Sequence, residues 1–227
     1  MLSYILYLKN RLNVYVILDI MYSIFINLLH FHMDMLYMNC ICVLKACFKE
    51  INNNLSHMLI VNNEPCVLTM FYYEQRNPFL IMKLNALMKK HMAISNAIQM
   101  LNTTFSVQLF ASIVVTILPI IVNTYIHLVQ WHDGLAFNLD EDGKIILSFI
   151  LYGTIKMALI VWACETGKNQ AQEIRTTIHH VLNSIRDEKI KYELQLFSLQ
   201  TLHCKITFSA KGFNVDATFL AIVSNAI

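Results

Sequence analysis

Charged residues and glycine are both scarce in this sequence, and each shortage excludes a class of protein. Charged side chains make up 14% of the 227 residues, against roughly 25% in an average soluble domain. The five glycines form no phosphate-binding loop, and no serine, threonine or cysteine lies in a nucleophile turn. A formal net charge of +2 is too small to indicate a nucleic-acid partner. The sequence therefore predicts neither an enzyme nor a nucleic-acid-binding protein, and no cofactor.

Apolar residues are abundant instead: 56% of the chain is hydrophobic, and the mean hydropathy is +0.50. The stretch 105–129 contains no Asp, Glu, Lys or Arg, and it exceeds the ~20 residues that a helix needs to cross the hydrocarbon core of a bilayer. Two further spans are predicted at about 12–38 and 145–164, with Asp19 and Lys156 as the charges deep inside them. The predicted fold class is an all-α, polytopic membrane helix bundle.

The distribution of lysine and arginine predicts the orientation of these spans. The connection 39–104 and the region after residue 164 carry most of the basic residues, whereas 130–144 carries only Lys144 among four acids. Positive charge is enriched on the cytoplasmic side of membranes. We therefore expect the two basic regions in the cytoplasm, and residues 12 and 130–144 outside.

The cytoplasmic regions also show helical patterns. Apolar residues recur at helical spacing in 39–61, 79–104 and 165–204, so the membrane helices are expected to continue beyond the bilayer. A stripe on the last of these regions predicts one buried face, at Ile174, Ile178, Val181, Leu182 and Ile185. The stretch 62–78, which contains Pro65 and Pro78, is predicted to be a loop.

Lys156 is the most informative single residue, because a lysine deep in a span costs ~2.5–3.5 kcal/mol and normally faces a partner or a wet cavity. Counted from the outer ends of their spans, Asp19 and Lys156 differ in depth by about 6 Å at 1.5 Å per residue. One hypothesis is an ion pair between them beside an outward-facing cavity. The alternative is that Asp19 lies among the lipid headgroups and Lys156 extends alone toward the interface.

A possible metal site lies at His30-x-His32-x-Asp34, because His30 and Asp34 are one helical turn apart. No third ligand accompanies them at a suitable spacing. An interfacial polar cluster is therefore the favoured interpretation, and no metal is predicted.

Three blocks of the sequence resemble successive parts of the insect gustatory receptors. The block 32–55 carries matches to the end of the family's fourth helix, at Asp34, Phe48, Asn52 and Leu55. The block 91–125 matches the start of the fifth helix, at His91, Asn102 and Phe105. The block 197–227 resembles the family's signature near the seventh helix, at Phe197, Leu199, Gln200, Ile206, Phe208, Ala210, Gly212 and Phe213.

This resemblance implies part of a seven-helix receptor with a longer native chain. The spans would correspond to helices four, five and six, with 188–211 as the cytoplasmic part of helix seven and 213–227 as the start of its pore-lining part. The family implies a ligand-gated cation channel in the plasma membrane, surrounded by lipid and assembled as a tetramer with identical or other gustatory receptor subunits. Pore candidates are Phe213, Asp216 and Phe219. Asp216 would favour cations at the inner pore mouth, or would simply stabilise a helix start.

The resemblance also implies a small-molecule tastant, bound in the outer half of the bundle. Candidate pocket residues, chosen by depth, are Tyr15, Asp19, Tyr22, Asn123, Tyr125, Tyr152 and Lys156. Two alternatives stay open at this point. One is a fragment of a G-protein-coupled receptor or transporter, and the other is a truncated receptor remnant without function.

Overall fold

The computed structural model consists of long helices and one short hairpin. It describes residues 2–63, 70–132, 142–185, 187–210, 213–215 and 218. The all-α fold class is confirmed. In chain order the elements are α1 (Leu2–Asn63), α2 (Met70–His132), α3 (Asp142–Ser184), α4 (Glu188–His203), β1 (Ser209–Ala210) and β2 (Phe213–Asn214).

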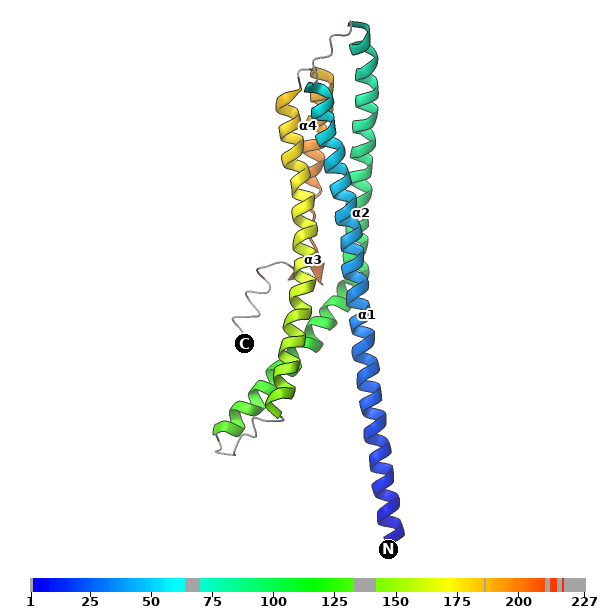
Figure 1. The fold of residues 1–227 in the computed structure, drawn as a ribbon, viewed down its shortest axis with the longest axis vertical. Helices are drawn as coiled ribbons and strands as arrows, with labels where there is room; N and C mark the ends of the chain where they lie inside the picture. The colour runs from blue at the N-terminus through cyan, green and yellow to red at the C-terminus, as the bar shows by residue number, and fades with distance from the viewer. Residues whose placement is uncertain are drawn as a thin grey trace.

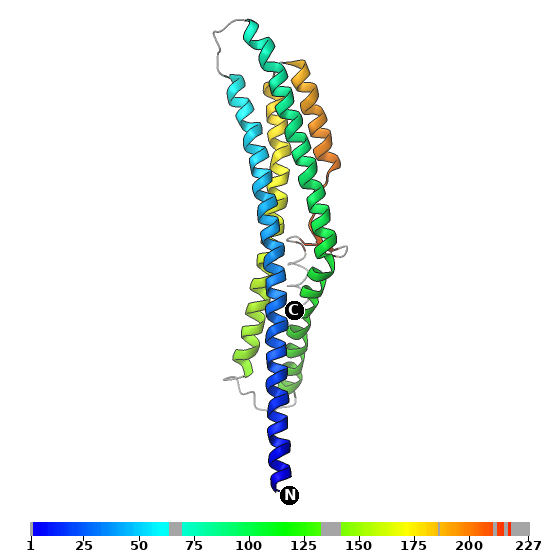
Figure 2. The same ribbon diagram turned by 90° about the vertical axis from the view of Figure 1, so that its right-hand side faces the viewer.

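The molecule has two halves along its length (Figures 1 and 2). In the half that contains α4, the C-terminal part of α1, the N-terminal part of α2, the C-terminal part of α3 and α4 itself lie side by side. In the other half, the second part of α2 leans toward the first part of α3, and the N-terminal end of α1 projects beyond both. By the predicted orientation, the four-helix half is the cytoplasmic one.

The four-helix half contains the apolar core. Ile174, Ile178 and Val181 of α3 are completely buried, and Leu182 and Ile185 pack against them. The stripe predicted for this helix is thus confirmed. The largest fully buried partners from the other helices are Tyr37, Ile41, Phe48, Ile51, Leu55, Leu84, Leu109, Leu194 and Phe197. Burial of this apolar surface is what holds the four helices together.

The other half exposes its apolar side chains. Along α1, for example, Met21 is 62% exposed and Tyr22 is 67% exposed. Parts of two helices, Val14–Met58 and Pro78–Val122, are long and apolar enough to cross a membrane. They overlap the predicted spans 12–38 and 105–129. The third predicted span, 145–164, lies in α3 and stays a prediction.

Three predicted helix boundaries differ from the structure. Residues 70–78 were expected in a loop but belong to α2, because the helix formers Glu74, Gln75 and Arg76 outweigh the single hydrogen bond that Pro78 removes. The helical region 165–204 is divided in two. Asp187 starts α4 by accepting hydrogen bonds from the backbone N–H groups of Lys189, at 2.8 Å, and Ile190, at 3.2 Å.

The third difference is that α4 ends at His203, not at residue 211. An extended segment follows it and leads into the hairpin, in which Ser209 pairs with Asn214 and Ala210 with Phe213. Phe213 therefore lies in a strand, although a helix was predicted to begin there. Gly167 of α3 makes room for this segment, because a Cβ atom there would lie 3.0 Å from Ile41 Cγ2 and 3.2 Å from Phe208 Cε2.

Candidate functional site: a buried polar ladder between three helices

An ion pair joins α1 to α3 in the middle of the molecule. Lys156 Nζ lies 2.7 Å from Asp34 Oδ2, and Ser112 Oγ of α2 donates a hydrogen bond to the same oxygen at 2.7 Å. Asp34 and Ser112 are each 1% exposed, and the side chain of Lys156 is 9% exposed. A single carboxylate thus connects three helices through two charge-assisted contacts.

The surroundings hold this carboxylate in place. Thr116, one turn further along α2, donates its hydroxyl to the Ser112 carbonyl oxygen at 2.7 Å. Asp34 Oδ1 is also buried and has no hydrogen-bond partner among the described residues. Since a buried carboxylate oxygen is normally satisfied, Oδ1 can accept one further hydrogen bond.

Two more polar pairs lie one turn away on either side. On one side, Gln108 Nε2 and His30 Nδ1 are 3.4 Å apart. On the other, the Tyr37 hydroxyl and Cys164 Sγ are 3.6 Å apart. The α1 members are residues 30, 34 and 37, a spacing that places them on one helix face. We call these contacts the polar ladder: His30–Gln108, Asp34–Ser112, Asp34–Lys156 and Tyr37–Cys164.

The ladder corrects the predicted partner of Lys156. Lys156 is buried and paired, as its depth suggested, but it pairs with Asp34 and not with Asp19. Asp19 is exposed, and it lies fifteen residues before Asp34 on the same helix, about 22 Å along its axis. If depth had been counted from the inner ends of the spans, at residues 38 and 164, Asp34 rather than Asp19 would have been predicted as the partner of Lys156. The possible metal ligands His30 and Asp34 instead contact Gln108 and Lys156.

Within the described part of the structure, the other predicted pocket residues do not gather around a common pocket. Tyr15, Tyr22, Tyr125 and Tyr152 are all exposed, by 59%, 67%, 67% and 47%. The side chain of Asn123 lies outside the part of the structure that can be described, as do Asp216, Phe219 and the side chain of Phe213. The tastant pocket and the pore residues therefore stay predictions.

The residues of the family signature form a second cluster, in the four-helix half. Gln200 Nε2 donates to the Met88 carbonyl oxygen at 2.9 Å and lies 3.4 Å from His91 Nδ1. The His91 ring is 1% exposed and packs between Phe48 and Phe197, with ring centroids 5.9 and 5.6 Å apart. These residues join α1, α2 and α4.

Asn102, a signature residue of α2, holds the segment after α4. Its Nδ2 donates to the Thr207 carbonyl oxygen at 2.7 Å, and its Oδ1 accepts from the Ser209 N–H at 3.3 Å. Phe208 between them is buried against the core. Gly212, also in the signature, lies outside the described residues. The signature residues that can be described therefore pack the four-helix half.

Burial lowers the pKa of His91 from 6.5 to about 4, and this predicts a pH-dependent stability. Between these values the unfolded chain binds a proton that the folded chain excludes, so folding free energy is lost as the pH falls from 6.5 toward 4. The expected loss is about 3 kcal/mol. Unfolding should be measured across this window for the parent chain and for His91→Phe. The parent should lose about 3 kcal/mol more than His91→Phe as the pH falls through this window, and parallel curves would contradict the prediction.

The fold and the polar ladder together define a polytopic helical protein whose polar side chains pair between helices. The sequence matches the 7tm chemosensory receptor family over residues 1–226, and the chain belongs to this family of membrane proteins. It is similar to a Drosophila melanogaster protein that carries the name gustatory receptor 28b, with 29% identity over 149 residues. That alignment covers 62% of this chain and 31% of the relative, so the chain spans about a third of the relative's length. The resemblance to insect gustatory receptors is confirmed, and the family is one of receptors, not of enzymes.

Proposed function

We propose that this chain is part of a gustatory receptor: a subunit of a ligand-gated, non-selective cation channel in the plasma membrane that opens when a small-molecule tastant binds. The family and the similarity to gustatory receptor 28b support a chemoreceptor. In the proposal the subunit works in a tetramer with identical or related gustatory receptor subunits. The tastant is bound in the outer half of the helix bundle.

The polar ladder is the observation that supports a conformational role most directly. It connects α1 to α2 and to α3 at the point along α1 where exposed apolar side chains give way to the buried ones of the four-helix half. Charge-assisted contacts of this kind are directional, so α1 and α3 cannot slide past each other gradually without breaking them. A tastant that moves the outer parts of these helices would shift the bundle between two discrete arrangements.

The test is electrical recording from cells that express this chain, alone and with other gustatory receptor subunits, during application of a panel of tastants. The expected result is a tastant-evoked cation current that discriminates little between sodium and potassium. Ser112→Ala, which keeps the charge pair, should change the tastant concentration that gives a half-maximal current. The matched control is Leu36→Ala, because Leu36 is 49% exposed on α1.

Surface labelling in the same cells separates the possible results. If the labelled chain reaches the surface but no tastant evokes a current in any combination, while gustatory receptor 28b responds in parallel, the channel proposal is wrong. If currents appear and Ser112→Ala has the same half-maximal tastant concentration as the parent, the receptor proposal is supported. The proposed role of the ladder in opening the channel is then wrong.

A further inference from the structure

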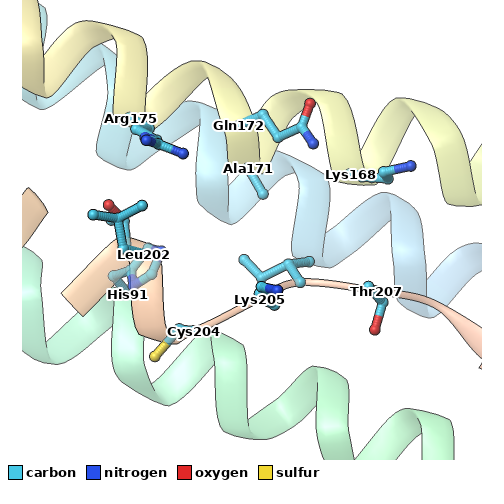
Figure 3. A pocket seen from close by; sticks show the side chains of 11 residues that line it. His91, Lys168, Ala171, Gln172, Arg175, Leu202, Cys204, Lys205 and Thr207 are labelled. Atoms are coloured by element: carbon cyan, nitrogen blue, oxygen red, sulfur yellow. The ribbon is translucent and has the colours of Figure 1, made fainter. Parts of the chain in front are cut away.

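A cavity of about 320 Å³ lies in the cytoplasmic half, between α3 and the segment that follows α4 (Figure 3). Lys168, Gln172 and Arg175 of α3 form one wall, and residues 204–207 run along the other. His91 of α2 lies at one end. The cavity is unrelated to the polar ladder, and no step of the proposed gating uses it.

The lining of this cavity is basic. Lys168, Arg175 and Lys205 contribute three positive charges, and none of the lining residues is acidic. Lys168 has one acidic neighbour, Glu165, at 3.8 Å. Within the described ranges, Arg175 and Lys205 take part in no ion pair. Three cations with so little compensation around one concave surface produce a focused positive potential.

Hydrogen-bond donors accompany the charges. The cavity is also lined by the amide of Gln172 and the hydroxyl group of Thr207, whereas the hydroxyl of Thr201 already donates to the Ser198 carbonyl oxygen. An arginine guanidinium binds phosphate oxygens through two parallel hydrogen bonds, and lysine adds a mobile point charge. This set of side chains suits an anion with several oxygen atoms better than a single halide ion.

The position of the cavity relates it to the membrane surface. Trp162 is 60% exposed, and Lys45 Nζ lies 5.6 Å from the centre of its ring, a combination typical of the interface. The predicted span ends two residues later. At 1.5 Å per residue, Lys168 lies about 6 Å and Arg175 about 16 Å beyond that end. Since the headgroup layer is roughly 5–7 Å thick, the cavity extends from this layer into the cytoplasm.

We propose that this basic pocket binds a phosphorylated inositol headgroup, carried either by a lipid of the inner leaflet or by a soluble inositol phosphate. Basic pockets between helices on the cytoplasmic side are a known form of headgroup site. The bound phosphates bridge Lys168 and Arg175 of α3 to Lys205, and so fix the segment after α4 against α3. The proposal depends on the orientation of the chain in the membrane, and it is independent of the channel function.

The experiment uses the whole chain in nanodiscs of phosphatidylcholine, with binding measured by thermophoresis. The probes are short-chain phosphatidylinositol bisphosphate, inositol trisphosphate and inorganic phosphate. The pocket variant is Lys168→Gln, Arg175→Gln and Lys205→Gln together. The matched control makes the same change of charge on exposed cytoplasmic lysines outside the pocket, through Lys49→Gln, Lys89→Gln and Lys189→Gln.

The affinity of the pocket variant for the bisphosphate lipid is expected to be about 100-fold lower than that of the parent chain. Each positive charge that is removed accounts for a loss of roughly tenfold or less. The control should lose about twofold or less. If inositol trisphosphate binds the parent chain as tightly as the lipid does, and loses as much affinity in the pocket variant, the ligand is a soluble inositol phosphate. If only the lipid binds, the ligand comes from the membrane. Both outcomes support a phosphate site.

Two results would overturn the proposal. One is the absence of saturable binding of either inositol probe by the parent chain up to about 1 mM. The other is an equal loss in the pocket and control variants, which would show a diffuse basic surface. If the triple pocket variant melts earlier than the parent, Arg175→Gln and Lys205→Gln are measured singly. Each should lose about fivefold relative to Lys189→Gln, and no loss in either would also overturn the proposal.

Discussion

Replacing Lys156 by methionine is expected to destabilise the folded chain by about 3–5 kcal/mol, because Asp34 then stays buried without a counter-charge. The contact that is lost is 2.7 Å long and almost completely shielded from solvent. Surface labelling and size-exclusion chromatography of a fluorescent fusion should show a large loss of folded protein. Stability should largely return when Asp34→Asn is added to Lys156→Met, since two neutral side chains carry no unpaired charge.

Asp19→Asn is the control for this prediction, because Asp19 is the other acid deep in the apolar part of α1. Asp19 is exposed, so its substitution should leave the amount of folded protein unchanged. If Asp19→Asn rather than Asp34→Asn rescues Lys156→Met, the pairing between α1 and α3 described above is incorrect.

Replacing Phe197 by alanine is expected to lower the free energy of unfolding of the four-helix half by about 3–5 kcal/mol. Phe197 is completely buried on α4, and it packs edge-on against the His91 ring with a centroid distance of 5.6 Å. Its removal leaves a cavity at the contact between α4 and α2. Thermal or denaturant unfolding, followed by circular dichroism, measures the effect.

The matched variant for Phe197 is Leu199→Ala on the same helix. Leu199 is 52% exposed, and surface substitutions usually change stability by no more than about 0.5 kcal/mol. Similar losses in both variants would mean that Leu199 is covered by another subunit or segment, or that α4 is not packed through Phe197. Repeating the comparison with a diluted sample distinguishes assembly from packing, because only assembly depends on concentration.

Helical periodicity predicted most of the fold. The stripe at Ile174, Ile178 and Val181 repeats at helical spacing, and these side chains form the buried face of α3. The end of α4 could not be predicted in this way. The backbone leaves the helix after His203 and is then held by Asn102, more than 100 residues earlier in the chain, which donates to the Thr207 carbonyl oxygen and accepts from the Ser209 N–H. Local sequence patterns contain no information about such a distant partner.

The polar ladder was predictable in part. The cost of burying a lysine singled out Lys156, and the pattern His30-x-His32-x-Asp34 indicated a polar cluster at the end of the first span. The sequence could not show that these belong to one site, because the pairing depends on which helices are neighbours and on how they are rotated. Neither Ser112 nor Gln108 differs in its local sequence from a polar residue that simply faces the bundle.

The two hydrogen bonds of Asn102 have a mechanical consequence. An asparagine side chain that donates to one backbone carbonyl and accepts from an N–H two residues later holds that backbone as a neighbouring β-strand would. Any rotation of α2 about its own axis that preserves both bonds must carry Thr207 and Ser209 with it, while the close fit at Gly167 stops the segment from yielding toward α3. Torque on α2 is thereby converted into displacement of the segment 207–209 and of the hairpin strand β1 that it leads into.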